Sequence, residues 1–204
     1  APGSFPNISV GADSVFDFDG SNDYITIQDS DSLSFGDGAN DSPFSISAWV
    51  NVDDTSINRI INKVGGSDAE WLFTTGTASR TLVLNLYSSG ATTSGPNRGL
   101  AGSTSLNSYI GQWVHVACSY DGRGGNAAYD GIKLYFNGQL ETVTTNISAG
   151  TTYTAMANGV APVRIGSDIY FTNNYMNGKI SNVQIWGTEL SAPEVTTLYN
   201  NGQP

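Results

Sequence analysis

Cysteine, charge and long hydrophobic runs are all scarce in this sequence, and each scarcity excludes a class of protein. The single cysteine, Cys118, has no partner for an internal disulfide, so the hydrophobic core itself must stabilise the fold. Charged residues make up only 13% of the chain, which argues against helical bundles and coiled coils. No apolar run approaches the roughly 18 residues that span a bilayer, so we expect no membrane insertion.

Basic residues are absent from the first 58 positions, which hold ten Asp, in a chain whose net charge is −10. A negative field repels phosphate backbones, so we expect no nucleic-acid partner. The same field attracts cations, and the acidic, glycine-containing loops 19–23 and 36–41 offer the oxygen ligands that calcium prefers. Because neither loop has EF-hand spacing, we predict a structural Ca²⁺ site assembled from separate loops. Its candidate ligands are Asp19, Asp23, Asp37 and Asp41.

Glutamate is equally scarce, and this bears on catalysis. The chain has four: Glu70, Glu141, Glu189 and Glu194. A retaining glycosidase needs two carboxylates about 5 Å apart, and no Glu here has another acid two or four residues away on a predicted strand. Asp17 and Asp19 have that spacing, but they flank a turn. The only histidine, His115, has no Ser, Cys or Asp partner that the sequence identifies, so we predict no enzyme activity.

Alternation of apolar and polar residues with period two is abundant, and it predicts strands. In the longest such run, the apolar side chains of residues 44–52 fall on one face of a strand. Further strands are predicted at 15–18, 24–27, 59–64, 70–74, 82–87, 132–137, 163–165 and 179–186. Asn137-Gly138 is a strong hairpin signal because both residues tolerate positive φ. About a dozen strands with this much apolar surface require two sheets that face each other.

One helix and two long loops complete the prediction. Ser191-Ala-Pro-Glu194 has the pattern of a capping box and begins a short helix, which we expect to cover one end of the sandwich. The stretches 88–108 and 144–160, rich in Gly, Ser, Thr and Asn, are predicted to be loops. We find no internal repeat and no linker, so residues 1–204 are predicted to be one domain. The chain begins without the apolar region of a signal peptide, which is typical of a mature or excised segment.

Four segments occur in an order that resembles the laminin G-like jelly-roll family. They are Phe18-Asp-Gly-Ser-Asn-Asp-Tyr24, Phe44-Ser-Ile-Ser-Ala-Trp-Val50, Trp113-Val-His-Val-Ala-Cys-Ser-Tyr-Asp-Gly122 with Leu134-Tyr-Phe-Asn-Gly138, and Asn177-Gly-Lys-Ile-Ser-Asn-Val-Gln-Ile-Trp186 with the helix. The resemblance implies an all-β, concanavalin A-like antiparallel sandwich with one short C-terminal helix. It also implies a cation near the C-terminal strand, where many relatives carry Asp and this chain has Ser181 and Asn182.

Aromatic residues are the main signal for a ligand, because sugars stack on Trp and Tyr and hydrogen-bond to amides. The segment 168–175 combines both kinds of side chain most densely. The candidate binding residues are Trp71, Tyr87, Tyr109, Tyr170, Asn173, Asn174 and Tyr175. The alternative for each aromatic residue is that it packs beneath a loop.

These observations favour a non-catalytic, extracellular binding or adhesion module within a larger surface or secreted protein. Its expected partner is a polysaccharide or a cell-surface glycan. The alternative is a structural or receptor-contact domain of a virion or a cell-surface assembly, which would contact other copies or neighbouring domains. A glycan array separates the two hypotheses, because a structural module should show no preference among saccharides.

Overall fold

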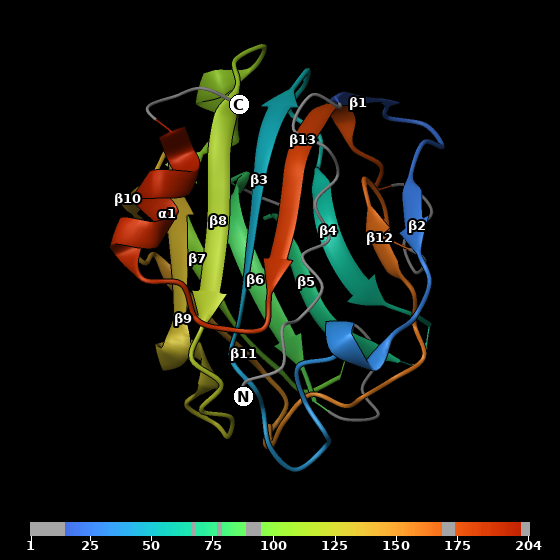
Figure 1. Cartoon of the computed structure of the whole chain (residues 1–204), viewed down its shortest axis with the longest axis vertical. Helices are drawn as coiled ribbons and strands as arrows, with labels where there is room; N and C mark the ends of the chain where they lie inside the picture. Colours follow the sequence, from blue (N-terminus) through green and yellow to red (C-terminus); the bar gives the residue numbers. More distant parts are fainter. Residues whose placement is uncertain (1–14, 67, 77–78, 89–94, 169–173, 201–204) are drawn as a thin grey trace.

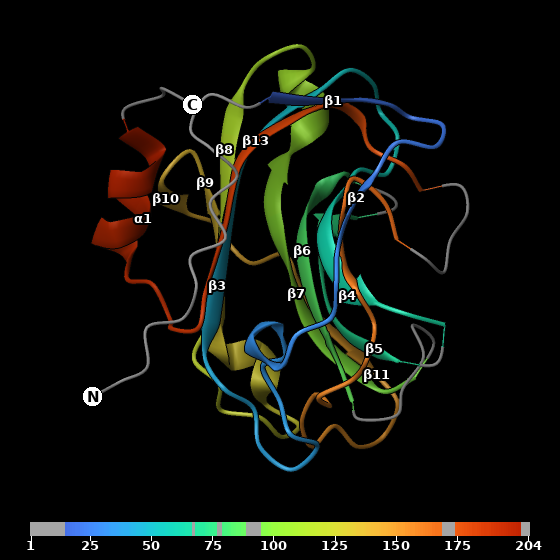
Figure 2. The same ribbon diagram turned by 45° about the vertical axis from the view of Figure 1, so that its right-hand side comes forward.

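Two antiparallel sheets, packed face to face, form the fold (Figures 1 and 2). The computed structural model describes residues 15–66, 68–76, 79–88, 95–168 and 174–200. The predicted all-β sandwich is confirmed. No helix in these described ranges is long and apolar enough to cross a membrane.

The first sheet has six strands in the order β1-β13-β3-β8-β9-β10. Their bounds are β1 Val15–Asp19, β3 Phe44–Val52, β8 Val114–Tyr120, β9 Ile132–Phe136, β10 Gln139–Leu140 and β13 Asn177–Trp186. The β9–β10 hairpin turns at Asn137 and Gly138, which have φ values of 48° and 74°, as the sequence predicted.

The second sheet has seven strands in the order β11-β7-β6-β5-β4-β12-β2. Their bounds are β2 Ile25–Ile27, β4 Arg59–Val64, β5 Ala69–Thr75, β6 Thr81–Tyr87, β7 Asn97–Ser105, β11 Thr145–Ala149 and β12 Val163–Ile165. Strands β7 and β11 correct the prediction that 88–108 and 144–160 are loops. Small polar residues and glycines obscure the alternation of apolar and polar side chains in both strands. Strand β7 forms because it pairs with β6 on one side and β11 on the other.

Inward-facing apolar side chains from both sheets fill the core. Phe44, Ile46 and Val50 from β3 are fully buried opposite Leu82 and Leu84 from β6. Cys118 lies in the same core, and burial raises the pKa of its thiol, so the group remains protonated. The alternation read from the sequence therefore assigns the inner face correctly.

Helix α1 (Ala192–Tyr199) corrects the expected position of the helix. It lies on the outer face of the six-stranded sheet instead of covering an end of the sandwich (Figure 2). Val195 packs with Ala117 and Tyr135, which point outward from β8 and β9. The helix shields these outward-facing apolar side chains from solvent. The predicted capping box is present, and the Ser191 backbone N–H donates to Glu194 Oε2 at 2.8 Å.

Three short 3-10 helices lie in the loops, at Asp31–Leu33, Leu106–Tyr109 and Ala128–Gly131. The first covers the core near β5, where the Trp71 indole N–H donates to the Leu33 carbonyl at 3.0 Å. The loops therefore close the ends of the sandwich and leave the outer face of the seven-stranded sheet without a helix among the described residues.

Candidate ligand-binding face

One row of residues crosses the outer face of the seven-stranded sheet. Strand pairing places its members opposite one another on six neighbouring strands: Thr26, Arg164, Asn62, Leu72, Asn85 and Gly99. We call this set the cross-strand row. The adjacent Ile61, Phe73 and Leu84 point into the core, so the row faces outward. At about 4.8 Å between strands, six strands span roughly 24 Å.

Gly99 determines how the row is arranged at one end. A Cβ at this position would clash with Asn85 Oδ1 and would lie 2.6 Å from the Leu84 carbonyl oxygen. Glycine therefore lets the Asn85 amide lie across the neighbouring strand. The amide is half-buried, so part of it remains in contact with solvent.

Several polar atoms on this face are buried without a hydrogen-bond partner among the described residues. Asn62 donates through Nδ2 to the Ser167 carbonyl at 2.7 Å, but its Oδ1 accepts no hydrogen bond. Asn85 Oδ1, Asn97 Oδ1 and Ser167 Oγ likewise have no hydrogen-bond partner, and Arg164 Nε has no acceptor. Nearly all buried polar groups in native proteins have a partner, so these atoms are exceptions. Asn62 and Ser167 are fully buried, whereas Asn85 and Arg164 are half-buried, so the last two side chains are the ones that reach solvent.

Tyr24 provides an aromatic ring at the β2 edge of the row. Its side chain is 45% exposed, and the Arg164 guanidinium carbon lies 4.1 Å from the ring centroid. Stacking of this kind is favourable and fixes the guanidinium plane. The row therefore combines a hydroxyl, a guanidinium, two amides and an aromatic ring.

A buried ion pair borders the row. Arg59 Nε donates to Asp168 Oδ2 at 2.5 Å, and Arg59 Nη1 donates to Thr74 Oγ1 at 2.9 Å. Tyr87 is buried beside Leu72, and burial raises the pKa of its phenol to about 12, so the group stays protonated. Asp168 is thus committed to Arg59 and is not available as a catalytic carboxylate.

The aromatic candidates from the sequence have mixed positions. Trp71 was expected on a surface, but it is completely buried, because its indole fills the core against Phe35 and Phe44. Tyr109 packs against Phe136, with ring centroids 4.8 Å apart.

The other tyrosine and asparagine candidates are Tyr87, Tyr170, Asn173, Asn174 and Tyr175. Tyr87 lies on the outer face but is only 3% exposed, so it offers little ring surface. Asn174 and Tyr175 are half-buried, and Tyr170 and Asn173 lie outside the described residues.

Sequence reasoning missed the cross-strand row itself. Its signal was present as single polar residues between apolar ones, in Val163-Arg-Ile165 and Leu84-Asn-Leu86. Each tripeptide alone looks like part of an ordinary strand. Only the register of the sheet shows that the two polar residues belong to one row.

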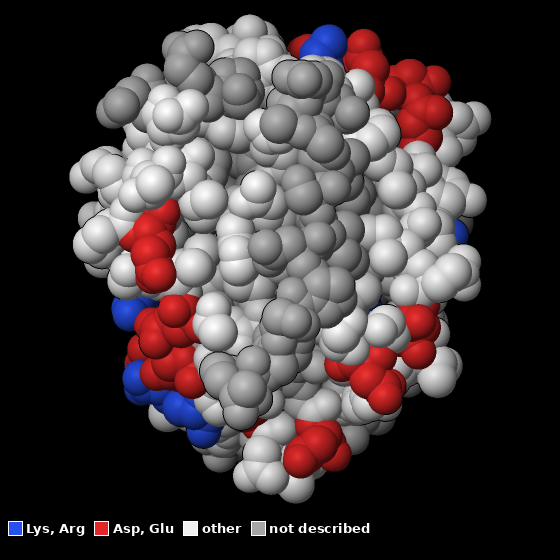
Figure 3. All heavy atoms as spheres, viewed as in Figure 1, with Lys and Arg blue, Asp and Glu red and all other residues white. Residues whose placement is uncertain are grey.

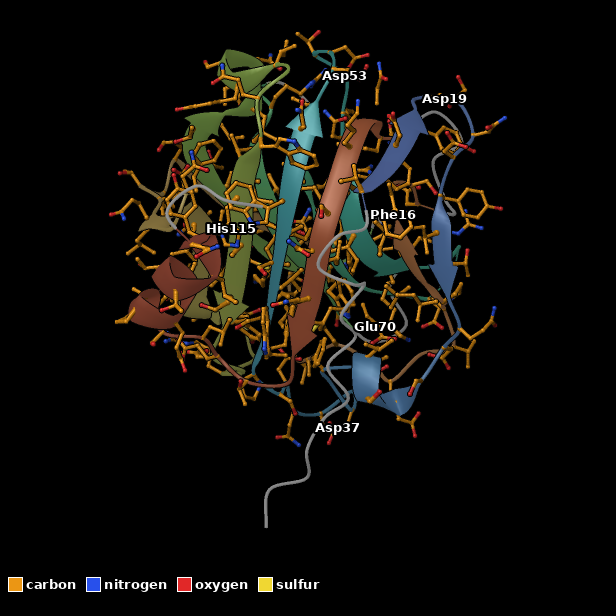
Figure 4. The ribbon with its side chains drawn as sticks, turned by 45° about the horizontal axis from the view of Figure 1, so that its top comes forward. Phe16, Asp19, Asp37, Asp53, Glu70 and His115 are labelled. Atoms are coloured by element: carbon orange, nitrogen blue, oxygen red, sulfur yellow. The ribbon has the colours of Figure 1, made fainter. Side chains whose placement is uncertain are left out.

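The four candidate calcium ligands do not converge. Loops 19–23 and 36–41 lie at opposite ends of the sandwich (Figure 4). In the first loop, the Ser21 N–H donates to Asp19 Oδ1 at 2.8 Å, and the Asp19 N–H donates to Asp23 Oδ2 at 3.1 Å. In the second, backbone N–H groups of Asn40 and Ala39 donate to Asp37 and hold its pKa below the usual value.

Asp41 is an internal hydrogen-bond acceptor. Its Oδ2 accepts from the Tyr120 and Tyr153 hydroxyls, each at 2.8 Å, and its Oδ1 accepts from the Met156 N–H at 2.8 Å. Burial raises the pKa of this carboxyl. Within the described ranges, no three His, Cys, Asp or Glu side chains are grouped to hold a metal, so the residues do not fit one calcium site shared by both loops. Calcium at either loop alone stays a prediction.

The remaining ionisable groups with unusual surroundings are structural. Lys63 is fully buried and donates to Glu70 at 2.5 Å and to the Gly159 carbonyl at 3.0 Å, and it also pairs with Asp29 at 2.9 Å. His115 lies beneath α1, and burial lowers its pKa to about 4 (Figure 4). Neither Glu70 nor His115 faces the cross-strand row.

Acidic side chains gather at one corner of the other face, near β1 (Figure 3). There Lys179 lies 3.6 Å from Asp17 and 3.9 Å from Asp53. Both carboxylates are largely exposed, so this charge is well solvated.

A hollow of about 120 Å³ lies between β7, β9 and β10, with a mainly apolar lining that includes Leu100, Leu134 and Leu140. Its charged residues are already paired: Lys133 with Glu189, and Glu141 with Thr104. The hollow therefore offers few polar contacts compared with the cross-strand row.

Comparisons with known proteins agree with this architecture. A family model described as the concanavalin A-like lectin/glucanases superfamily matches residues 19–196. A comparison with curated protein sequences gives no match.

Several solved structures are similar to the chain, among them two neurotoxin binding domains and a pentraxin. The botulinum neurotoxin serotype G binding domain has a TM-score of 0.54 at 16% identity, covering 97% of this chain and 47% of that one. The binding domain of botulinum neurotoxin DC, in complex with rat synaptotagmin II, has a TM-score of 0.53 at 19% identity, covering 80% and 37%. The heptameric SAP-like pentraxin from Limulus polyphemus has a TM-score of 0.53 at 16% identity, covering 86% and 81%. The chain thus spans less than half of the neurotoxin domains, and at these identities the likeness shows a shared fold.

Proposed function

The chain belongs to the concanavalin A-like lectin/glucanases superfamily, and from this premise we propose that it is a non-catalytic module that binds an extended saccharide. The ligand lies along the cross-strand row on the outer face of the seven-stranded sheet. The fold alone does not assign a function, so the proposal depends on this face.

The observation that carries the proposal is the row of polar side chains with unpartnered buried atoms. Asn85 presents a half-buried amide whose Oδ1 accepts no hydrogen bond within the described residues, and the half-buried Arg164 lies in the same row. Asn62, between them, is fully buried beneath Ser167 and supports the row from below. Saccharide hydroxyls are donors and acceptors at close intervals, which suits amides. The exposed ring of Tyr24 adds a stacking surface. A length of about 24 Å suits a chain of several sugar rings better than one ring.

The positions of the carboxylates support binding without cleavage. Asp168 is paired with Arg59, and Glu70 is paired with Lys63 inside the sandwich. Hydrolysis of a glycoside needs two carboxyl groups that flank the bond, one of them able to donate a proton. The described part of the row provides no such pair.

An extracellular location and a parent protein of larger size are part of the proposal. The laminin G-like fold is common outside the cell, and the similar structures are described as binding domains. An isolated site of this kind is expected to be weak, micromolar to millimolar, and several copies would raise the avidity.

A glycan array with the folded chain tests this function. We expect binding to at least one polysaccharide, and we expect Asn85→Ala to weaken it about two- to tenfold, because one neutral hydrogen bond is lost. Asn107→Ala is the matched control, since Asn107 is an exposed asparagine in the Leu106–Tyr109 helix, away from the row. Absence of any saccharide binding, together with a homogeneous multimer in solution, would instead favour a structural or receptor-contact domain.

A further inference from the structure

Arg164 differs from every other basic residue of the chain. All eight Lys and Arg lie in the described ranges, and seven of them have a carboxylate, carbonyl, amide or hydroxyl acceptor. Those seven are Arg59, Lys63, Arg80, Arg98, Arg123, Lys133 and Lys179. Arg164 has no acceptor among the described residues, and its one contact with another charged or aromatic group is the Tyr24 ring.

The surroundings of Arg164 leave its donors unused. The side chain is half-buried, and Nε is covered but has no acceptor. Tyr24 holds one face of the guanidinium plane at 4.1 Å, which leaves the edge that carries the two Nη groups free for a ligand. Its register partners on either side are the Thr26 hydroxyl and the Asn62 amide.

An unpaired cation is unexpected in a protein with a net charge of −10. Such a protein has ten more acidic than basic side chains, and a nearby carboxylate would normally pair with each Arg. The general field also repels anionic ligands, so only a site with its own uncommitted cation could hold one. A guanidinium binds two oxygens of a carboxylate or a sulfate through two parallel hydrogen bonds to an anion, which a neutral sugar cannot offer.

Building on the proposed saccharide site, we propose that Arg164 forms a subsite for the anionic group, a carboxylate or a sulfate, of an acidic saccharide. The Arg164 edge donates to the oxyanion. The exposed Thr26 hydroxyl lies on the next strand and can hydrogen-bond to a hydroxyl of the same sugar. Tyr24 keeps the guanidinium oriented, so little side-chain entropy is lost on binding.

The test uses the full chain and paired polysaccharides. Polygalacturonate, alginate and heparin are each compared with their carboxyl-reduced or desulfated forms, beside neutral xylan and β-glucan. We expect the wild type to bind at least one acidic polymer about tenfold or more tightly than its neutralised form, because a charge-assisted pair is lost. Arg164→Gln should abolish that difference, whereas Arg123→Gln should keep it, since Arg123 is exposed and already paired with Asp121.

Each outcome decides one of the two proposals. Loss of binding on carboxyl reduction identifies the anion as carboxylate, loss on desulfation of heparin identifies it as sulfate, and either result supports the subsite. Equal binding of acidic and neutralised forms, unchanged by Arg164→Gln, overturns the subsite but leaves the saccharide function in place. No binding to any polymer by a folded wild type overturns both. Should Arg164→Gln fail to fold, Arg164→Lys keeps the charge but lacks the planar fork, and it should lose most of the preference for the acidic form.

Discussion

The two outer faces of this sandwich differ in what covers them and in the side chains they carry. On the six-stranded sheet, Trp49 stacks on Tyr199 at 5.7 Å and meets His115 edge-on at 5.4 Å, so the helix closes the face with aromatic packing. On the seven-stranded sheet, the row from Thr26 to Gly99 holds four polar residues, one leucine and one glycine, and no described helix covers it.

Buried polar atoms without a partner occur on both faces, and their chemistry separates the two. Asn51 Oδ1, His115 Nδ1 and Ser119 Oγ lie on the six-stranded side, and all three are neutral. The seven-stranded side also has neutral atoms of this kind, three of them asparagine oxygens, but it adds the uncommitted guanidinium of Arg164. The difference teaches that a buried atom without a partner does not by itself mark a ligand site. What distinguishes the seven-stranded face is an unused charge, which is suited to recognition, whereas aromatic packing is suited to stability.

The largest loss of stability is expected when the aromatic packing between the six-stranded sheet and α1 is removed. Trp49 is 3% exposed, and Trp49→Ala removes the surface on which Tyr199 stacks. We expect the free energy of unfolding to fall by about 3–5 kcal/mol, measured by urea denaturation. Tyr24→Ala on the opposite face should cost far less, because that ring is 45% exposed. Equal losses for the two variants would contradict the distinction between the faces.

A smaller loss in the free energy of unfolding, of about 3 kcal/mol, is expected on the same face when the pH is lowered. Burial lowers the pKa of His115 from 6.5 to about 4, so between these values the unfolded chain binds more protons than the folded one. The stability that His115 contributes is therefore complete above pH 6.5 and is lost as the pH falls toward 4. The measurement is the free energy of unfolding of wild type and His115→Gln at several pH values between 7 and 4.

The comparison with His115→Gln isolates the histidine from other titrating groups. Asp41 and Glu70 also have raised pKa values, and they titrate equally in both proteins. Only the difference between the two curves belongs to His115. A difference that does not change with pH would show that the imidazole is not kept neutral by burial beneath α1.

The two faces also differ in how far the sequence predicted them. Alternation in 44–52 and the capping box at Ser191 gave the inner face and the helix correctly, because both signals are local. The helix position was wrong, because nothing local shows that Ala117 and Tyr135 leave an apolar surface outside the sandwich.

The cross-strand row was missed for a related reason. Asn62, Asn85 and Arg164 are far apart in the sequence and meet only through strand register, which depends on pairing between distant segments. Trp71 was misplaced because Ala69-Glu-Trp-Leu-Phe73 has no clear alternation of apolar and polar residues, and a bulge beside Lys63 and Val64 alters the local pattern.

The smallest of the three effects is expected on the seven-stranded face, from Gly99→Ala. The new Cβ would clash with Asn85 Oδ1 and lie 2.6 Å from the Leu84 carbonyl, so side chain and backbone must both shift. We expect a loss of about 1–3 kcal/mol in the free energy of unfolding, typical of overpacking. Gly76→Ala is the matched control, because a Cβ there meets nothing closer than 3.5 Å.

The double variant Gly99→Ala/Asn85→Ala separates the two clashes and links stability to recognition. Removing the amide should restore part of the lost stability, since only the backbone contact then remains, but it should not restore saccharide binding. This result would show that glycine is needed at position 99 to leave room for the Asn85 amide. The orientation of that amide would then be maintained even though glycine lowers the stability of the strand. Full recovery of stability and binding together would show instead that Gly99 matters only for packing, and that Asn85 contributes nothing to the ligand.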